Sequence, residues 1–337
     1  MDTTTPPFEL ERSTARDQLT ELLGQEAISA LHIRSDVRGW LAVAACWLTI
    51  VALLLTALLA ITRLGWWSLP VVLVCVMFTG GRILGLAILS HEASHRTLFN
   101  SPRLNDLIGD WLCAAPVYLD LKKYRQHHAR HHVYTGTDKD VDLPLIQGFP
   151  TNSRSLMRKF FRDFSGQTGV KSLIGFALMN AGQIRWNVTG VVEWLPERPR
   201  HLSQQVLTFF VNSRRTLIFH ALFFTVCWSA GVTELFFLWW AGYLFAYPFC
   251  IRVRSIAEHA VTERSEDMMK NTRTTRAGFI SRALFAPYHV NFHIEHHCLV
   301  AVPFWQLPRL HQLVQQAGIL PRPPGYWQVI KLASSAD

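Results

Sequence analysis

The chain has 337 residues, half of them hydrophobic, and a mean hydropathy of +0.15. Soluble domains of this length rarely have a positive mean hydropathy, so the composition indicates a membrane protein. The formal net charge is +9, but there is no soluble basic face with interleaved aromatic residues, which argues against nucleic acid as a partner. We interpret the excess of Lys and Arg as cytoplasmic loop charge beside anionic lipid headgroups.

The first 39 residues are polar and charged, and they contain no short apolar core of a cleaved signal peptide. We expect residues 1–39 to be a cytoplasmic N-terminal segment. The six cysteines lie mostly in apolar stretches without a C-x-x-C pair, which is typical of buried thiols in a reducing compartment.

Two apolar blocks follow in chain order, and each is expected to form a hairpin of membrane-spanning helices. A span needs roughly 20 mostly apolar residues. In the first block only Arg63-Leu64-Gly65 separates the two arms, which requires a tight antiparallel turn; the second block turns near residues 231–234. The four expected spans are 40–61, 66–90, 216–231 and 233–251, within a membrane domain over 40–315 that is followed by a C-terminal tail over 316–337.

Basic residues are concentrated before the first block, between the blocks and after the second, whereas the hairpin tips carry little beyond Arg63. By the positive-inside rule, these three regions are cytoplasmic. The expected fold is therefore an all-α membrane protein with four transmembrane helices in two hairpins and a cytoplasmic helical cap.

Three clusters contain most of the histidines, at 91–95 (HEASH), 127–132 (HHARHH) and 293–297 (HIEHH). In the first, two histidines stand one helical turn apart on one face. In the second and third, the spacing i, i+3, i+4 is expected to point three imidazoles at one place. The metal ligands predicted from these clusters are His91, His95, His128, His131, His132, His293, His296 and His297.

Metal binding explains the clusters best, because packing many imidazoles together costs charge repulsion and desolvation unless a metal takes their lone pairs. HEASH also fits the H-E-x-x-H pattern of zinc peptidases, so an intramembrane zinc metalloprotease is a remote alternative. Catalytic zinc needs only about three protein ligands, which leaves most of the clustered histidines without a role. So many nitrogen ligands suit two redox metals and O2 activation. A metal transporter would place its ligands within the bilayer, whereas these clusters lie outside the expected spans.

The clusters resemble the three histidine boxes of the membrane fatty acid desaturase superfamily, H-x(3–4)-H, H-x(2–3)-H-H and [HQ]-x(2–3)-H-H. Here they read HEASH, HARHH and HIEHH. The first box with its tail, HEASHR, is more similar to the acyl-lipid type than to the acyl-CoA type. The third box starts with His, unlike the Gln of front-end desaturases. The resemblance covers about residues 40–315.

This resemblance implies a further ligand after the last span, a place that His259 fits. It also implies two non-haem iron ions, O2 as co-substrate and desaturation of a lipid acyl chain, with hydroxylation or ketolation of a lipid, alkane or carotenoid as the alternative. The chain contains no H-P-G-G signature of cytochrome b5 and no flavin fingerprint. The electron donor is therefore expected to be a separate ferredoxin or cytochrome b5 type protein, and the location to be a bacterial inner membrane.

Several residues beside the proposed ligands are candidates for a supporting role. Carboxylates there usually orient imidazole N–H groups, and two spare histidines are either ligands or hydrogen-bond donors to them. Three basic residues are weak candidates for holding a substrate headgroup, since positive-inside charge explains them equally well. The supporting candidates are His127, His289, Glu92, Asp140, Glu258 and Glu295, and the headgroup candidates are Lys122, Lys123 and Arg125.

Overall fold

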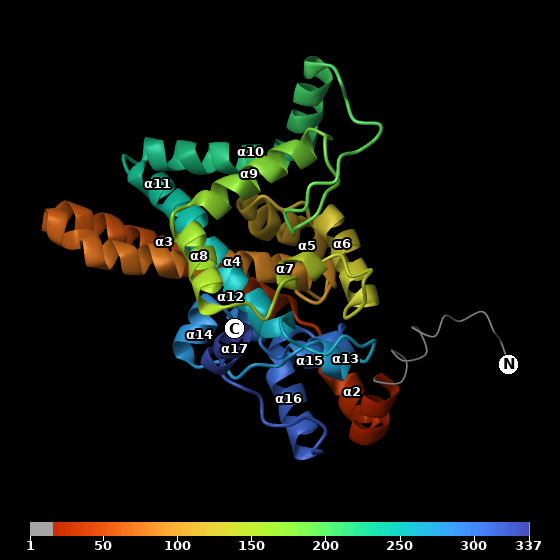
Figure 1. Cartoon of the computed structure of the whole chain (residues 1–337). Coiled ribbons are helices and arrows are strands. Elements are labelled where there is room, and N and C mark those ends of the chain that lie inside the picture. The colour runs from red at the N-terminus through yellow and green to blue at the C-terminus, as the bar shows by residue number, and fades with distance from the viewer. Residues whose placement is uncertain (1–15, 337) are drawn as a thin grey trace.

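The structure, a computed structural model, describes residues 16–336 (Figure 1). Its regular elements are all helical, and within the described residues extended segments pair only through isolated bridges. The all-α prediction is therefore confirmed.

The first apolar block forms a long antiparallel hairpin of α3 (Asp36–Leu64) and α4 (Leu69–Ser94), joined by the 3-10 turn η1 (Gly65–Ser68). The Ser35 side chain caps α3 by accepting from the backbone N–H of Arg38. The turn residues Trp66 and Trp67 are 96% and 87% exposed at the hairpin tip. Exposed tryptophans at such a tip are typical of a membrane–water interface.

The second apolar block forms α10 (Leu202–Ser229) and a continuous helix made of α11 (Glu234–Ala241), the π-helical η4 (Gly242–Ala246) and α12 (Tyr247–His259). The hairpins α3–α4 and α10–α11 project to the same side of the molecule in Figure 1. α10 begins well before the expected residue 216.

Within residues 16–336, two helical stretches are long and apolar enough to cross a membrane: Asp36–Ser94, which contains both arms of the first hairpin, and Glu234–His259. Much of their apolar surface is exposed, as at Leu48 and Leu73, which suits contact with lipid rather than with water. α10 does not meet the same criterion, so four separate spans remain a prediction.

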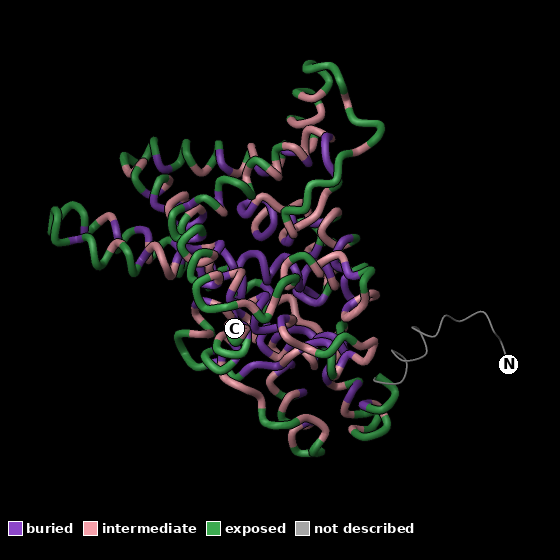
Figure 2. The backbone as a smooth tube through the Cα atoms, viewed as in Figure 1, coloured by how far each residue is buried: buried purple, intermediate pink, exposed green. Residues whose placement is uncertain are grey.

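The other helices cover the end of the hairpins that carries the histidine clusters, and burial is concentrated there (Figure 2). Close backbone packing positions this region: α4 meets η4 at Gly80, where a Cβ would lie 2.5 Å from the Ala246 side chain, and meets η2 at Gly109, where a Cβ would clash with Ala93. These other elements are α2 (Gln25–Leu31), α5 (Pro102–Ile108), η2 (Gly109–Ala114), η3 (Ala115–Val117), α6 (Leu121–Tyr134), α7 (Leu143–Ile146), α8 (Ser153–Phe164), α9 (Gln167–Asn180), α13 (Met268–Asn271), α14 (Phe279–Leu284), η5 (Pro287–His289), α15 (His293–Cys298), η6 (Phe304–Gln306), α16 (Leu307–Gln316) and α17 (Tyr326–Ala333).

The two ends of the described chain pack against the rest. Residues 1–15 of the expected N-terminal segment lie outside the described residues, but α2 buries Ile28 and Leu31 against residues of α16. At the other end, α17 buries Val329 and Ala333 beside α12. The last helix is thus part of the same packed body as the histidine clusters.

Candidate metal centre

Four helices deliver the clustered histidines to one place. α4 continues beyond its apolar part to Ser94 and supplies the first box, α6 supplies the second, and α15 the third. The Asp120 side chain caps α6 by accepting from the backbone N–H of Lys123 at 3.0 Å. The end of α12 supplies His259.

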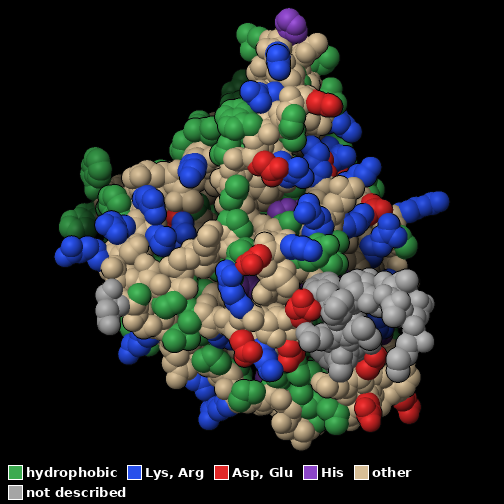
Figure 3. All heavy atoms as spheres, turned by 45° about the vertical axis from the view of Figure 1, so that its right-hand side comes forward, with side chains coloured by type: hydrophobic (Ala, Val, Ile, Leu, Met, Phe, Trp, Pro, Cys, Tyr) green, Lys and Arg blue, Asp and Glu red, His purple; other side chains and the backbone are tan. Residues whose placement is uncertain are grey.

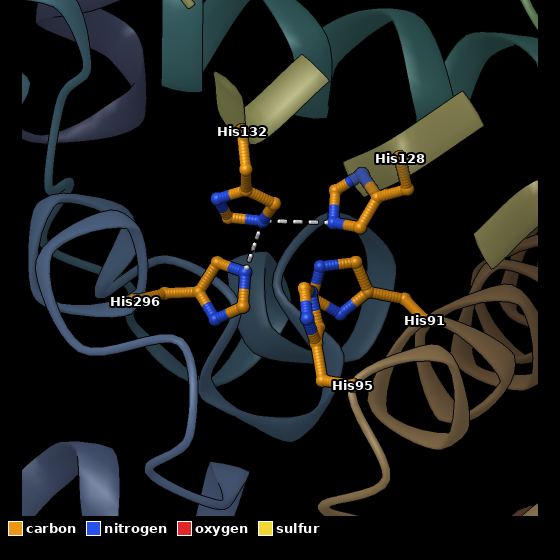
Figure 4. A group of neighbouring side chains, drawn as sticks. All are labelled: His91, His95, His128, His132 and His296. Carbon is orange, nitrogen blue, oxygen red and sulfur yellow. Dashed lines mark hydrogen bonds between the residues drawn. The ribbon is translucent and has the colours of Figure 1, made fainter. Parts of the chain in front are cut away.

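The first group of histidines gathers His91 and His95 from α4, His128 and His132 from α6, and His296 from α15 (Figure 4). Their ligand nitrogens lie within 4.8 Å of one another. The Nε2 atom of His132 is 3.0 Å from Nε2 of His128 and 3.2 Å from Nε2 of His296. Five imidazoles from three helices therefore face a common point.

The second group consists of His131, His259, His293 and His297, again with ligand nitrogens within 4.8 Å of one another. The Nε2 atom of His293 is 2.8 Å from Nε2 of His259 and 3.1 Å from Nε2 of His297. The two groups adjoin, because the ring centroids of His132 and His297 are 4.2 Å apart. The structure thus brings together all nine predicted ligands, as two neighbouring sets of five and four.

One expectation about the boxes is wrong. The histidines of a box do not all point at one place: His131 joins a different group from His128 and His132, and His296 is separated from its own box in the same way. Successive residues of an α-helix are rotated by about 100°, so adjacent histidines diverge. The second and third boxes therefore each contribute histidines to both groups.

Burial keeps most of these imidazoles uncharged. It lowers the pKa of His128, His132, His293, His296 and His297 well below 6.5, and neighbouring histidines lower it further. Neutral imidazoles present lone pairs, which is the state that a metal requires.

The donor set fits a pair of metal ions. A hydrogen bond between two Nε2 atoms needs a proton on one atom and a lone pair on the other. The Nε2 atom of His132 has only one of the two to offer, so it cannot form full hydrogen bonds with both His128 and His296. Several ring nitrogens of the described residues are also buried without a hydrogen-bond partner, including Nε2 of His91 and Nε2 of His95. Buried orphan nitrogens are costly unless a cation uses their lone pairs. Two ions would remove this cost.

The carboxylates of Asp140 and Asp142 lie beside the second group and interact with its His131. His131 Nδ1 donates to Asp140 Oδ1 at 2.8 Å and lies 3.7 Å from Asp142 Oδ2. Although burial lowers the pKa of His131, the carboxylates of Asp142 and Asp140 outweigh this effect and raise it. His127 lies outside both groups and contacts Asp142 at 2.7 Å, so it supports the site indirectly.

Glu258 also contacts the second group of histidines, and it pairs with Arg254, which was not among the predicted site residues. Its Oε2 atom lies 3.6 Å from His293 Nε2, and its Oε1 accepts from Arg254 Nε at 2.9 Å. Arg254 stands one helical turn before Glu258 on α12. That i, i+4 spacing next to His259 was the available sequence signal for this ion pair.

The other two predicted carboxylates connect the boxes to segments that are distant in the sequence. Glu92 accepts from the Thr97 hydroxyl at 2.9 Å and from the backbone N–H of Phe304 at 3.1 Å. Glu295 accepts from the Thr274 hydroxyl and contacts His311 Nδ1. His311 is not among the predicted site residues, and no local spacing indicates its role, because α16 brings it back to Glu295 through the tertiary fold.

The remaining candidates lie outside the two groups. His289 has a left-handed backbone (φ +61°) and stacks on Phe292. Arg125 donates to the backbone carbonyls of Ser94 and Ala93 and pairs with Asp106 at 2.6 Å, so it fastens α6 to the last turn of α4. Lys122 is exposed and Lys123 half-buried.

Comparison with known proteins identifies a family and several relatives of low sequence identity. The model of the family described as "Fatty acid desaturase" matches residues 64–329. The chain is 24% identical to the dihydrorhizobitoxine desaturase of Bradyrhizobium elkanii, over 93% of this chain and 80% of that protein. It is 26% identical to the sn-1 oleoyl-lipid 12-desaturase of Synechocystis, over 75% and 70%. It is also 22% identical to the zeaxanthin 4-ketolase of Chlamydomonas reinhardtii, over 70% of this chain and 43% of that protein.

Proposed function

The chain belongs to the fatty acid desaturase family, and from this premise we propose that it desaturates a lipid acyl chain in an O2-dependent reaction at a histidine-ligated di-iron centre. Membership makes it an oxidoreductase. One observation carries the proposal: two adjoining sets of histidines converge at the end of the apolar hairpins, and most of their rings are buried. Similarity to a lipid 12-desaturase favours an acyl-lipid substrate.

We assign one iron to the group of five histidines and the other to the group of four. When bound, the iron pair supplies the O2 activation that is needed to remove hydrogen from an unactivated methylene. The chain keeps most of the ligand imidazoles neutral by burial and fixes the ring of His131 through Asp140. The cap also limits the access of water to the site, which strengthens the electrostatic contacts within it.

The proposed membrane placement has four spans in two hairpins, with the cap and both termini in the cytoplasm. The two apolar stretches and the exposed tryptophans at the tip of the first hairpin support it. α10, which is paired with α11, is proposed as the remaining span. A bacterial inner membrane and a separate ferredoxin or cytochrome b5 type donor complete the proposal.

A second outcome at the same centre is hydroxylation or ketolation, and the similarity to a zeaxanthin ketolase supports it. The two outcomes differ in whether the carbon loses a second hydrogen or gains oxygen. A shift of about 1 Å in the position of the target carbon is enough to change such a preference. The zinc protease alternative is disfavoured, because the two histidines of the HEASH box belong to a group of five histidines, whereas catalytic zinc uses about three protein ligands.

Expression in a host with a compatible reductase, followed by mass spectrometry of the lipids, tests the proposal. We expect a product two mass units lighter than its precursor, with a new double bond, which disappears in the His132→Ala variant. A gain of one oxygen atom would favour the second outcome. An unchanged lipid profile from a protein that holds one zinc and no iron would contradict both.

A further inference from the structure

The α8 helix carries a cationic stripe and an apolar stripe side by side on its surface. Arg154, Arg158 and Arg162 recur every four residues and are exposed. Met157 and Phe161 are also four residues apart, and they are 62% and 68% exposed. Residues at this spacing share one side of a helix. α8 is thus amphipathic on a surface that the rest of the described chain leaves uncovered.

The three exposed arginines of α8 form no ion pair within the part of the chain that the structure describes. Asp163 is the single acidic residue of α8, and it is buried and already accepts from Arg252 at 2.5 and 2.8 Å. No carboxylate of residues 16–336 forms an ion pair with the three exposed arginines. The crowding of charge is also visible in Lys159, whose pKa is lowered by burial and then by Arg252, Arg162 and Arg158. An external anion would relieve this repulsion.

Packing places α8 beside the end of an apolar stretch. Phe249 of α12 contacts the rings of Phe160 and Phe164 of α8, with centroids 5.1 and 4.5 Å apart. Arg252, which holds Asp163, is the first charged residue after the apolar residues of that helix. α8 lies against α12 where the hairpins leave the cap (Figure 1). This is the level expected of a membrane surface.

We propose that α8 lies in the cytoplasmic membrane interface and that its three exposed arginines bind the headgroups of anionic phospholipids. The apolar stripe would enter the acyl region beneath those headgroups, which is the usual arrangement of an interfacial amphipathic helix with a basic flank. A soluble phosphate would neutralise the arginines but leave Met157 and Phe161 in water. An anionic lipid satisfies both stripes. The proposal rests on the proposed membrane placement, and it is independent of the reaction at the metal centre.

Cations gather on other parts of the surface too (Figure 3), so the test needs a matched charge control. The full chain is reconstituted in nanodiscs of phosphatidylcholine with or without phosphatidylglycerol. Retained phosphatidylglycerol is counted by native mass spectrometry, and hydrogen exchange is followed over residues 153–164. Each cation near an anionic surface strengthens binding about fivefold. The Arg154→Gln/Arg158→Gln/Arg162→Gln variant is therefore expected to lose roughly 100-fold in preference for phosphatidylglycerol.

The control variant Arg276→Gln/Arg309→Gln/Arg322→Gln removes three exposed charges elsewhere, and we expect it to retain phosphatidylglycerol like the wild type. Both variants should keep the wild-type iron content and lipid product, which separates this proposal from the proposed reaction. If the α8 variant retained as much phosphatidylglycerol as the wild type, the proposal would be overturned. Protection of α8 by inorganic phosphate in discs of phosphatidylcholine alone would also overturn it, because this would indicate a site for soluble anions.

A second variant, Phe161→Ser, tests the apolar stripe separately, without changing any charge. We expect faster hydrogen exchange over residues 153–164 in discs of either composition, because the helix loses apolar contact with the acyl region. Exchange as slow as in the wild type would show that α8 does not enter the membrane, and it would equally overturn the proposal.

Discussion

Replacing Asp140 tests how the carboxylates hold the centre. Asp140 is buried, and its Oδ1 accepts from His131 Nδ1 at 2.8 Å and from the backbone N–H of Asp142 at 2.9 Å. Asp140→Asn keeps an acceptor oxygen but removes the charge. Hydrogen bonds to charged groups contribute about 1.5–3 kcal/mol and neutral ones about 0.5–1.5 kcal/mol. The loss of about 1–1.5 kcal/mol corresponds to roughly a tenfold weaker hold on the second metal.

Asp140→Ala removes the bond altogether and leaves the ring of His131 free to turn, so we expect a loss near the upper end of the 10- to 100-fold range typical of such partners, about 100-fold. Asp138→Asn is the matched control, since Asp138 lies two residues away and pairs with Arg264 on the exposed surface. Iron per chain after dialysis against a graded chelator series measures the effect. If Asp140→Asn retained as much iron as Asp138→Asn, the assigned role of Asp140 would be refuted.

Three further predictions concern the same centre. His296→Ala should abolish lipid oxidation and lower the iron content. His201→Ala should change neither, because His201 is exposed at the start of α10 and belongs to neither histidine group. The reverse pattern, read from lipid mass spectra and elemental analysis, would refute the site assignment. His311→Gln should weaken the hold on Glu295 and lower turnover several-fold with near-normal protein yield, and a wild-type rate would show that the contact is dispensable. Burial holds the pKa of His296 and its cluster neighbours well below the ordinary 6.5, so below about pH 6.5 the unfolded chain binds protons that the folded metal-free protein does not. The metal-free protein should therefore lose thermal stability as the pH falls from 7.5 to 5.5, and an unchanged melting temperature in a detergent-based thermal assay would contradict this.

The histidine boxes were predictable because they depend only on the spacing of residues within one helix. A spacing of four residues on a helix places His91 and His95 on one face whatever the rest of the chain does. The partition of the boxes between the two groups was not predictable from spacing alone. It depends on how α6 and α15 are rotated against each other, and this rotation determines that His296 joins the group of His132 while His297 joins the group of His131.

Some of the residues that support the ligands could likewise be predicted from the local sequence, and others could not. Asp140 and Glu258 lie near a ligand in sequence, so their neighbourhood gave a signal. His311 and Thr274 reach Glu295 only through the packing of separate segments, and nothing in their local sequence indicates this. For the fold, apolar length correctly predicted the α3–α4 hairpin, but α10 mixes polar and apolar residues over 28 positions, so length and composition alone do not define its boundaries.

The metal content of the purified wild-type protein tests the central claim most directly. Elemental analysis combined with Mössbauer spectroscopy on iron-57-enriched protein should give two iron ions per chain, in two nitrogen-rich environments that differ because one group has five histidines and the other four. A single zinc per chain with no iron, in protein that is folded and prepared in the presence of iron, would contradict the account.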